Sequence, residues 1–166
     1  KQAETRYDSA DFESAIELYQ LAADGFEQAQ DWHGYVCSLT KIGASYTEMS
    51  LLPEAREALD KAIATGRQTI GEQNAEMAEA FNYLGAYFGE LGKMEEQLIN
   101  YERSLEIRLA VLGPDHIKVA TNYNDIGTYH YFLGDYELGL DFLEKALLIY
   151  TESDLLESGE AGTCYN

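Results

Sequence analysis

The sequence predicts an all-α fold, a right-handed solenoid of antiparallel helix pairs. A glycine-centred segment recurs at Gly43, Gly85 and Gly127, so successive copies lie 42 residues apart. Apolar residues flank each copy at helical spacing. Only two prolines occur in 166 residues, which allows long uninterrupted helices. Because one helix pair cannot bury its apolar side alone, pairs repeated at a fixed step are expected to stack on one another.

The repeat divides the chain into five segments. They are a partial unit over 1–30, full units over 31–73, 74–115 and 116–157, and the start of a further unit over 158–166. The first partial unit is recognised because 11–19 matches 135–143, and the last because 162–166 follows 120–124 by 42 residues. We therefore expect one repeat array, cut from a longer protein.

The middle unit shows where its two helices begin and end. We expect the first helix over roughly 75–91 and the second over 94–112. Gly92 is expected to form the tight turn between them, because glycine adopts positive φ freely. Gly113 is expected to end the second helix, Asp115 to cap the next one, and His116 either to cap it or to face water.

The recurring glycine is expected to let the first helix of each pair approach its neighbour closely. Gln97 and Gly139 lie at the start of their second helices. The equivalent positions of earlier second helices keep alanine, at Ala15 and Ala55.

The charge balance limits the classes of partner. The net charge is -19, from 30 acidic and 11 basic residues. Such a chain repels phosphate backbones and anionic membrane surfaces, so we expect no nucleic-acid or membrane binding. The charge favours solubility and a basic partner, although acidic residues that simply coat solvated helix faces are the more common cause of such a charge. Two distant cysteines, Cys37 and Cys164, form no disulfide framework, which indicates a reducing, cytoplasmic compartment.

The repeat is similar to the tetratricopeptide repeat (TPR), whose usual period is about 34 residues. The similarity rests on Leu84, Gly85, Phe88, Gly92 and Tyr101. The longer step, with Leu-Gly-Pro-Asp-His at 112–116, resembles the kinesin-light-chain type of TPR. The resemblance implies a right-handed TPR solenoid that holds a protein or peptide in a concave groove lined by the first helices, and it does not imply an enzyme.

The resemblance also implies which side chains line that groove. They are Thr40, Thr47, Glu79, Asn82, Ala86, Glu90, Thr121, Asn124, Thr128, Tyr131 and Asn166. Three of these, Asn82, Asn124 and Asn166, form a column at 42-residue steps. An asparagine amide both donates and accepts, so the column could hydrogen-bond the main chain of an extended peptide. The alternative is that the asparagines satisfy neighbouring backbone or water.

Other kinds of chemistry find little support in the sequence. Lys41 is the one basic residue near the groove positions, so no clamp for a C-terminal carboxylate is expected. His33 and Cys37 share a helix face, but zinc needs about four ligands, and no third candidate is near. No phosphate-binding loop, nucleophile elbow or HExxH motif occurs, so we expect no cofactor, metal or catalysis. Two alternatives stay open: a sensor segment that controls an attached protease or kinase domain, and self-association through exposed repeat ends.

Overall fold

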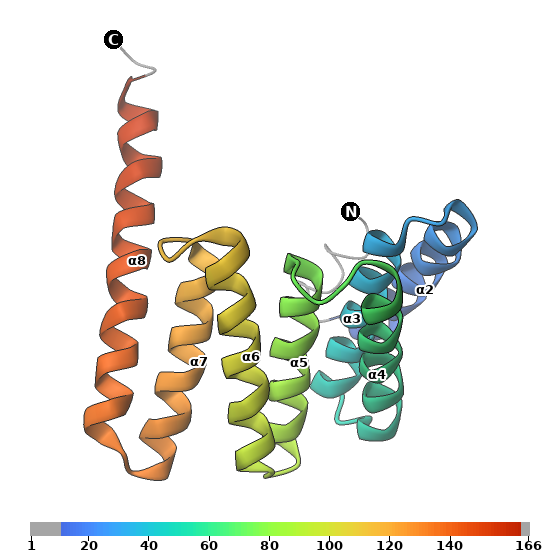
Figure 1. Cartoon of the computed structure of the whole chain (residues 1–166), viewed down its shortest axis with the longest axis horizontal. Helices are drawn as coiled ribbons and strands as arrows, with labels where there is room; N and C mark the ends of the chain where they lie inside the picture. Colours follow the sequence, from blue (N-terminus) through green and yellow to red (C-terminus); the bar gives the residue numbers. More distant parts are fainter. Residues whose placement is uncertain (1–10, 164–166) are drawn as a thin grey trace. The chain divides into compact units, whose positions relative to one another are not determined.

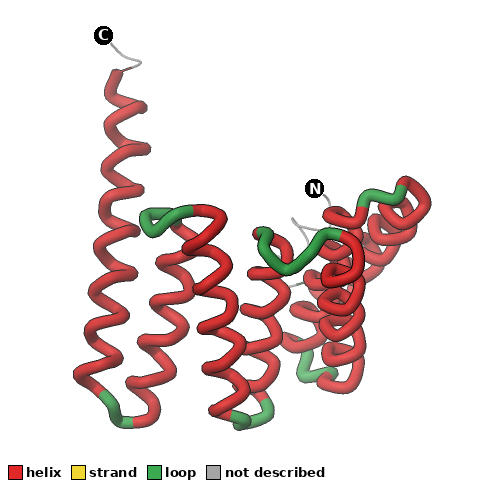
Figure 2. Tube along the Cα trace, in the orientation of Figure 1, coloured by secondary structure: helices red, strands yellow, loops and turns green. Residues whose placement is uncertain are grey.

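The computed structural model describes residues 11–163, with side chains up to residue 153. The described part is all-α, as predicted, and Figure 2 shows helices joined by short loops without a strand among these residues. The helices, labelled in Figure 1, are α2 (Phe12–Ala29), α3 (Trp32–Glu48), α4 (Leu52–Thr69), α5 (Ala75–Glu90), α6 (Met94–Leu112), α7 (Ile117–Leu133) and α8 (Tyr136–Thr163). Helices α3, α5 and α7 are the first helices of their pairs, and α2, α4, α6 and α8 are second helices.

The described part of the chain divides into two compact units between Ile107 and Arg108, within the sequence of α6. In the first unit, α3 packs against α2 and α4, and α5 packs against α3 and α4. In the second unit, α7 packs against α8. The large side chains buried most completely are Leu59, Met77 and Ile107 in the first unit and Val119 and Ile126 in the second. Each unit therefore has an apolar interior built between its helices.

Short polar side chains cap the first turns of several helices. Asp11, Asp31 and Asn74 each accept a hydrogen bond from the backbone N–H three residues on, at 3.3, 3.1 and 2.9 Å. These bonds satisfy donors that the helix itself leaves open. At the other ends, Gly92 and Gly134 have φ values of +67° and +88°, so the predicted turn at Gly92 is confirmed.

The cap of α7 is one of the two residues expected there. Gly113 ends the preceding helix at φ +85°, as expected. The cap is His116, whose Nδ1 accepts from the Lys118 N–H at 3.1 Å, so the expected capping by His116 is confirmed and that by Asp115 was wrong. A capping residue needs extended backbone, and His116 has it, with φ −79° and ψ 138°.

The recurring glycine lies where the first helix of each pair crosses the second. An added Cβ would come within 2.6 Å of Leu59 at Gly43, 2.6 Å of Tyr101 at Gly85, and 2.8 Å of Leu143 at Gly127. In each pair the facing side chain comes 16 residues after the glycine. The repeat register read from the sequence therefore holds at the level of individual contacts.

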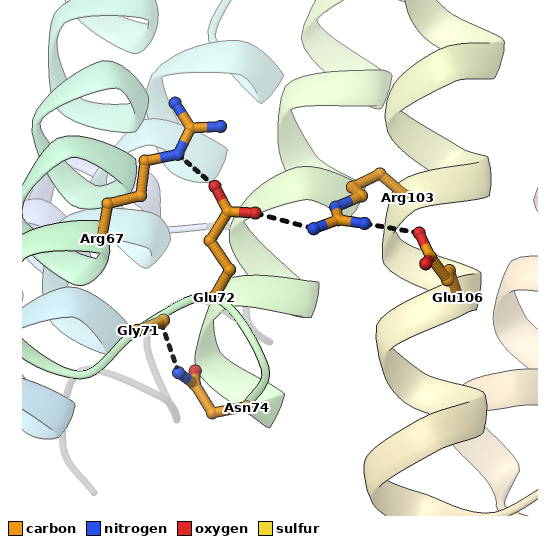
Figure 3. Close-up of polar contacts among 6 residues, drawn as sticks. All are labelled: Arg67, Gly71, Glu72, Asn74, Arg103 and Glu106. Atoms are coloured by element: carbon orange, nitrogen blue, oxygen red, sulfur yellow. Dashed lines mark hydrogen bonds and ion pairs between the residues drawn. The ribbon is translucent and has the colours of Figure 1, made fainter.

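A chain of ion pairs fixes the loop between α4 and α5. Figure 3 shows the Glu72 carboxylate between the guanidinium groups of Arg67 and Arg103. Arg103 Nη2 lies 2.7 Å from Glu72 Oε2, and its Nη1 lies 2.5 Å from Glu106 Oε2. Hydrogen bonds from Arg103 and Arg67 lower the pKa of the Glu72 carboxyl below its ordinary value of 4.5. Glu72 therefore joins α4 to α6 through the loop.

Replacing Glu72 with glutamine is expected to lower the free energy of unfolding at pH 7 by less than about 1 kcal/mol, because the pairs are partly exposed. A lowered folded-state pKa contributes stability above pH 4.5, which is lost as the pH falls through the folded value. Urea titrations at pH 7, 5 and 3 should show the two proteins converge at acidic pH. Glu17→Gln, on the exposed side of α2, is the control. A gap that stays constant with pH would contradict the role given to Glu72.

Candidate functional site

Helices α3 and α5 place a cluster of polar side chains on one side of the first unit. Lys41 Nζ of α3 lies 2.7 Å from Glu79 Oε1 and donates a hydrogen bond to the Tyr83 hydroxyl at 3.2 Å, both on α5. The same ammonium lies 5.1 Å from the centroid of the Tyr83 ring. The Lys41 and Glu79 side chains are 18% and 17% exposed. We call this surface the groove face and define it by Lys41, Glu79, Asn82, Tyr83 and Ala86.

The charge of Lys41 is balanced within the groove face. Burial alone would lower the pKa of Lys41, but the negative charge of Glu79 and hydrogen bonds to Glu79 and Tyr83 outweigh it and raise the pKa above its ordinary value. Lys41 is therefore a cation already held by a carboxylate. A ligand carboxylate would have to displace Glu79, which is a physical reason against a carboxylate clamp here.

The other predicted residues of the first unit differ in accessibility. Asn82 and Ala86 are half-buried on α5, and Glu90 is exposed at its end. Thr40 and Thr47 are 1% and 6% exposed, and their hydroxyls donate to the carbonyls of Val36 and Gly43 at 2.8 and 2.9 Å. These two threonines are therefore buried, and their hydroxyl protons are used within α3.

The predicted residues of the second unit lie on α7. Thr121 and Asn124 are exposed, Thr128 is half-buried, and Tyr131 is 56% exposed. Thr121 is engaged by its own helix and by α8, because it donates to the Ile117 carbonyl at 3.2 Å and accepts from the Tyr150 hydroxyl at 3.4 Å. Asn166 lies outside the described residues. The asparagine column thus has one described member in each unit, and its role stays a prediction.

The contact between Lys41 and Tyr83 is a feature that the sequence analysis missed. The two residues lie 42 positions apart, so they hold the same place in successive repeats. Asp125 is the next member of that column. A comparison of every column, and not only of the asparagines, would have shown a cation and an aromatic ring at the same position of successive repeats.

Two observations on the described residues concern metal binding. Within residues 11–153, no three histidine, cysteine, aspartate or glutamate side chains gather as a metal site would require. His33 instead pairs across to α5, with its Nδ1 3.3 Å from Glu76 Oε1.

Among the described helices, none combines the length and the apolar character needed to cross a membrane.

Known proteins resemble this chain in repeat and in fold. Residues 76–152 match the family model described as "Tetratricopeptide repeat". The structure of BtubC (BKLC) from P. vanneervenii is similar, with a TM-score of 0.73 and 17% identity over 92% of this chain and 62% of that one. A putative kinesin light chain of Podosopora anserina, with nearly identical TPR-like repeats, has a TM-score of 0.61 and 15% identity over 91% of this chain and 72% of that one.

These comparisons bear on the fold. At 17% and 15% identity the likeness to the solved structures shows the fold alone, and this chain spans less than two thirds of the length of BtubC. No curated protein sequence matches it significantly. Repeats of this family generally serve as scaffolds for protein–protein interaction. Residues 76–152 thus carry tetratricopeptide repeats, and the described chain shares the all-α fold of TPR-like repeat proteins.

Proposed function

We propose that this protein is a scaffold that holds a partner as an extended peptide along the faces of its first helices. The observation that supports the proposal most is the composition of the groove face. Its one cation, Lys41, is balanced by Glu79, and the half-buried Asn82 lies on the same helix as Glu79 and the small Ala86. A face of this kind suits a neutral polar ligand, and the main chain of a peptide is such a ligand.

The asparagine amide fits that ligand. It carries two N–H donors and an oxygen with two lone pairs, so one internal contact leaves capacity for a second partner. A peptide unit offers the complementary N–H and C=O groups at every residue. Asn124 repeats the same position in the second unit and is exposed. Recognition of this kind grips the main chain and tolerates varied side chains.

The charge of the protein favours a basic partner. The net charge of -19 attracts cationic segments over distances that exceed direct contact, and salt screens this attraction. Glu90, exposed at the end of α5, adds a carboxylate near the groove face. We therefore propose that charge assists the encounter, while hydrogen bonds to the main chain hold the complex.

Replacing Asn82 and Asn124 together with alanine is expected to weaken peptide binding about tenfold, because each lost hydrogen bond is worth about 0.5–1.5 kcal/mol. The ligand is a peptide selected by display of a random library on the wild-type protein, and calorimetry measures its affinity. Circular dichroism should show unchanged helicity.

The matched control is Asn100→Ala. Asn100 lies on a second helix, where its Nδ2 donates to the Glu96 carbonyl at 2.7 Å. This variant should bind the selected peptide as the wild type does. Equal affinities of the wild type and the Asn82→Ala, Asn124→Ala variant would reject the asparagine column as the binding device.

A further inference from the structure

A cavity of about 310 Å³ is lined by residues of the second helices α2 and α4 and of the first helix α3. Its floor is apolar and aromatic and consists of Tyr35, Leu39 and Ile42, which are 4%, 7% and 5% exposed. Its volume lies at the lower end of the roughly 300–1,000 Å³ of ligand pockets. The cavity therefore suits a single side chain better than a helix.

The rim of this cavity is acidic. Asp24 and Glu27 of α2 and Glu54 and Glu57 of α4 line it, and all four are exposed. Lys61 is the one basic side chain in the lining. Four carboxylates against one ammonium leave three negative charges in excess. A cation that enters the cavity is therefore attracted by its rim and is partly shielded from water by its floor.

The cavity already holds a cation of the chain itself. Lys61 Nζ lies 5.5 Å from the centroid of the Tyr35 ring, within the range of a cation–π contact. A hydrogen bond with Tyr35, together with the charges of Glu27 and Glu57, raises the pKa of Lys61 above its ordinary value. The cavity thus already accommodates a side chain of the protein itself, Lys61, whose alkyl stem carries a cationic head beside an aromatic ring.

The equivalent cavity one repeat further on is lined differently, although the repeat register is the same. Between α4 and α6, Glu27, Leu39, Glu57 and Lys61 are replaced by Arg67, Phe81, Ile99 and Arg103. Both arginines there are paired with Glu72. The excess of acid is therefore a property of the first cavity and not a consequence of the repeat.

We propose that the cavity between α2 and α4 receives an arginine or lysine side chain of a partner protein. The aliphatic stem packs on Leu39 and Ile42, and the charged head reaches Glu27 and Glu57 at the rim. The floor of the cavity is formed by Tyr35, Leu39 and Ile42 of α3. Lys41 of the same helix belongs to the groove face and does not line the cavity. The cavity is thus a second contact surface, independent of the asparagine column.

The test is a nuclear magnetic resonance titration with two peptides of equal shape. One is a capped pentapeptide with a central arginine between alanines, and the other carries neutral citrulline in its place. The arginine peptide should shift the backbone amide signals of Tyr35, Leu39 and Ile42, and the citrulline peptide should not. Equal shifts from the two peptides, or shifts confined to other helices, would overturn the proposal.

Charge variants locate the interaction. Glu27→Gln with Glu57→Gln should weaken binding of the arginine peptide about fivefold, since each partly exposed charge pair contributes modestly. Glu137→Gln with Glu144→Gln makes the same change in net charge at exposed positions of α8 and should leave the affinity unchanged. Equal weakening by both pairs would show only a general effect of charge and would contradict the site.

Lys61→Gln provides a test in the opposite direction. It removes the ammonium that competes for Tyr35, Glu27 and Glu57, so the arginine peptide should bind about threefold more tightly. Weaker binding by this variant would contradict the proposal. The Asn82→Ala, Asn124→Ala variant should bind the arginine peptide as the wild type does, which separates this site from the groove face.

Discussion

Replacing Gly85 with leucine is expected to lower the free energy of unfolding of the first unit by about 3 kcal/mol, because overpacking a filled interior is costly. An added Cβ at Gly85 would lie 2.6 Å from Tyr101 Cδ1 and 3.2 Å from the Gln97 carbonyl oxygen. Tyr101 is only 7% exposed, so its ring has no open space into which to turn. The larger leucine must therefore push α5 away from α6.

Urea titration followed by the fluorescence of Trp32, the one tryptophan, reports on this unit. Gly25→Ala is the matched control, because a Cβ at Gly25 meets nothing within 4 Å and the residue lies inside α2. Alanine should stabilise that helix by about 0.5–1 kcal/mol. If Gly85→Leu leaves the midpoint unshifted, α5 does not approach α6 as the repeat register requires.

Replacing Asn122 with alanine is expected to lower the free energy of unfolding of the second unit by about 2–3 kcal/mol. Arg108 Nη1 donates to Asn122 Oδ1 at 2.7 Å and to the Lys118 carbonyl at 2.9 Å. Arg108 and Asn122 are 4% and 0% exposed. Alanine deprives a buried guanidinium of an acceptor, and hydrogen bonds to charged groups are worth about 1.5–3 kcal/mol.

Hydrogen exchange of the backbone amides measures this loss locally. Protection of α7 should fall by about a hundredfold, while that of α3 should stay the same, since about 1.4 kcal/mol corresponds to a factor of ten. Asn124→Ala, two residues on along the same helix and exposed, should leave protection unchanged. Similar losses in the two variants would show that the buried pair does not stabilise this unit.

The repeat made most of the helical framework readable from the sequence. The expected helices over 75–91 and 94–112 are observed as Ala75–Glu90 and Met94–Leu112. The glycine column and its facing column of Leu59, Tyr101 and Leu143 meet as their common spacing required. Such features recur in each copy, so their pattern stands out from the variable residues around them.

Features that depend on contacts between elements were not readable. The choice of His116 over Asp115 as the cap of α7 follows from the backbone path after Gly113, which residue types alone do not specify. Gly139 departs from the expected alanine, and the structure gives the reason: its Cβ would lie 2.9 Å from the Gly127 carbonyl oxygen. Here the two helices approach too closely for any side chain.

The candidate site was predictable only in part. The asparagine column is visible in the sequence, but the pairing of Lys41 with Glu79 and Tyr83 depends on how α3 packs against α5. The burial of Thr40 and Thr47 also depends on packing. Helix α8 continues to Thr163. It passes residue 158, where the repeat register predicts the start of a further unit, and this predicted boundary stays a prediction.

Recognition of a peptide main chain by the asparagine column is tested most directly by N-methylation of single peptide bonds in the selected peptide. Each methyl group removes one backbone donor and leaves the side chains in place. Calorimetry should show that at least one methylated peptide binds the wild type about tenfold more weakly than the unmodified peptide does. The same methylation should weaken binding to the Asn82→Ala, Asn124→Ala variant much less, because the hydrogen-bonding partner of the methylated group is already removed there. If every methylated peptide binds the wild type as tightly as the unmodified one, the column does not hold the main chain.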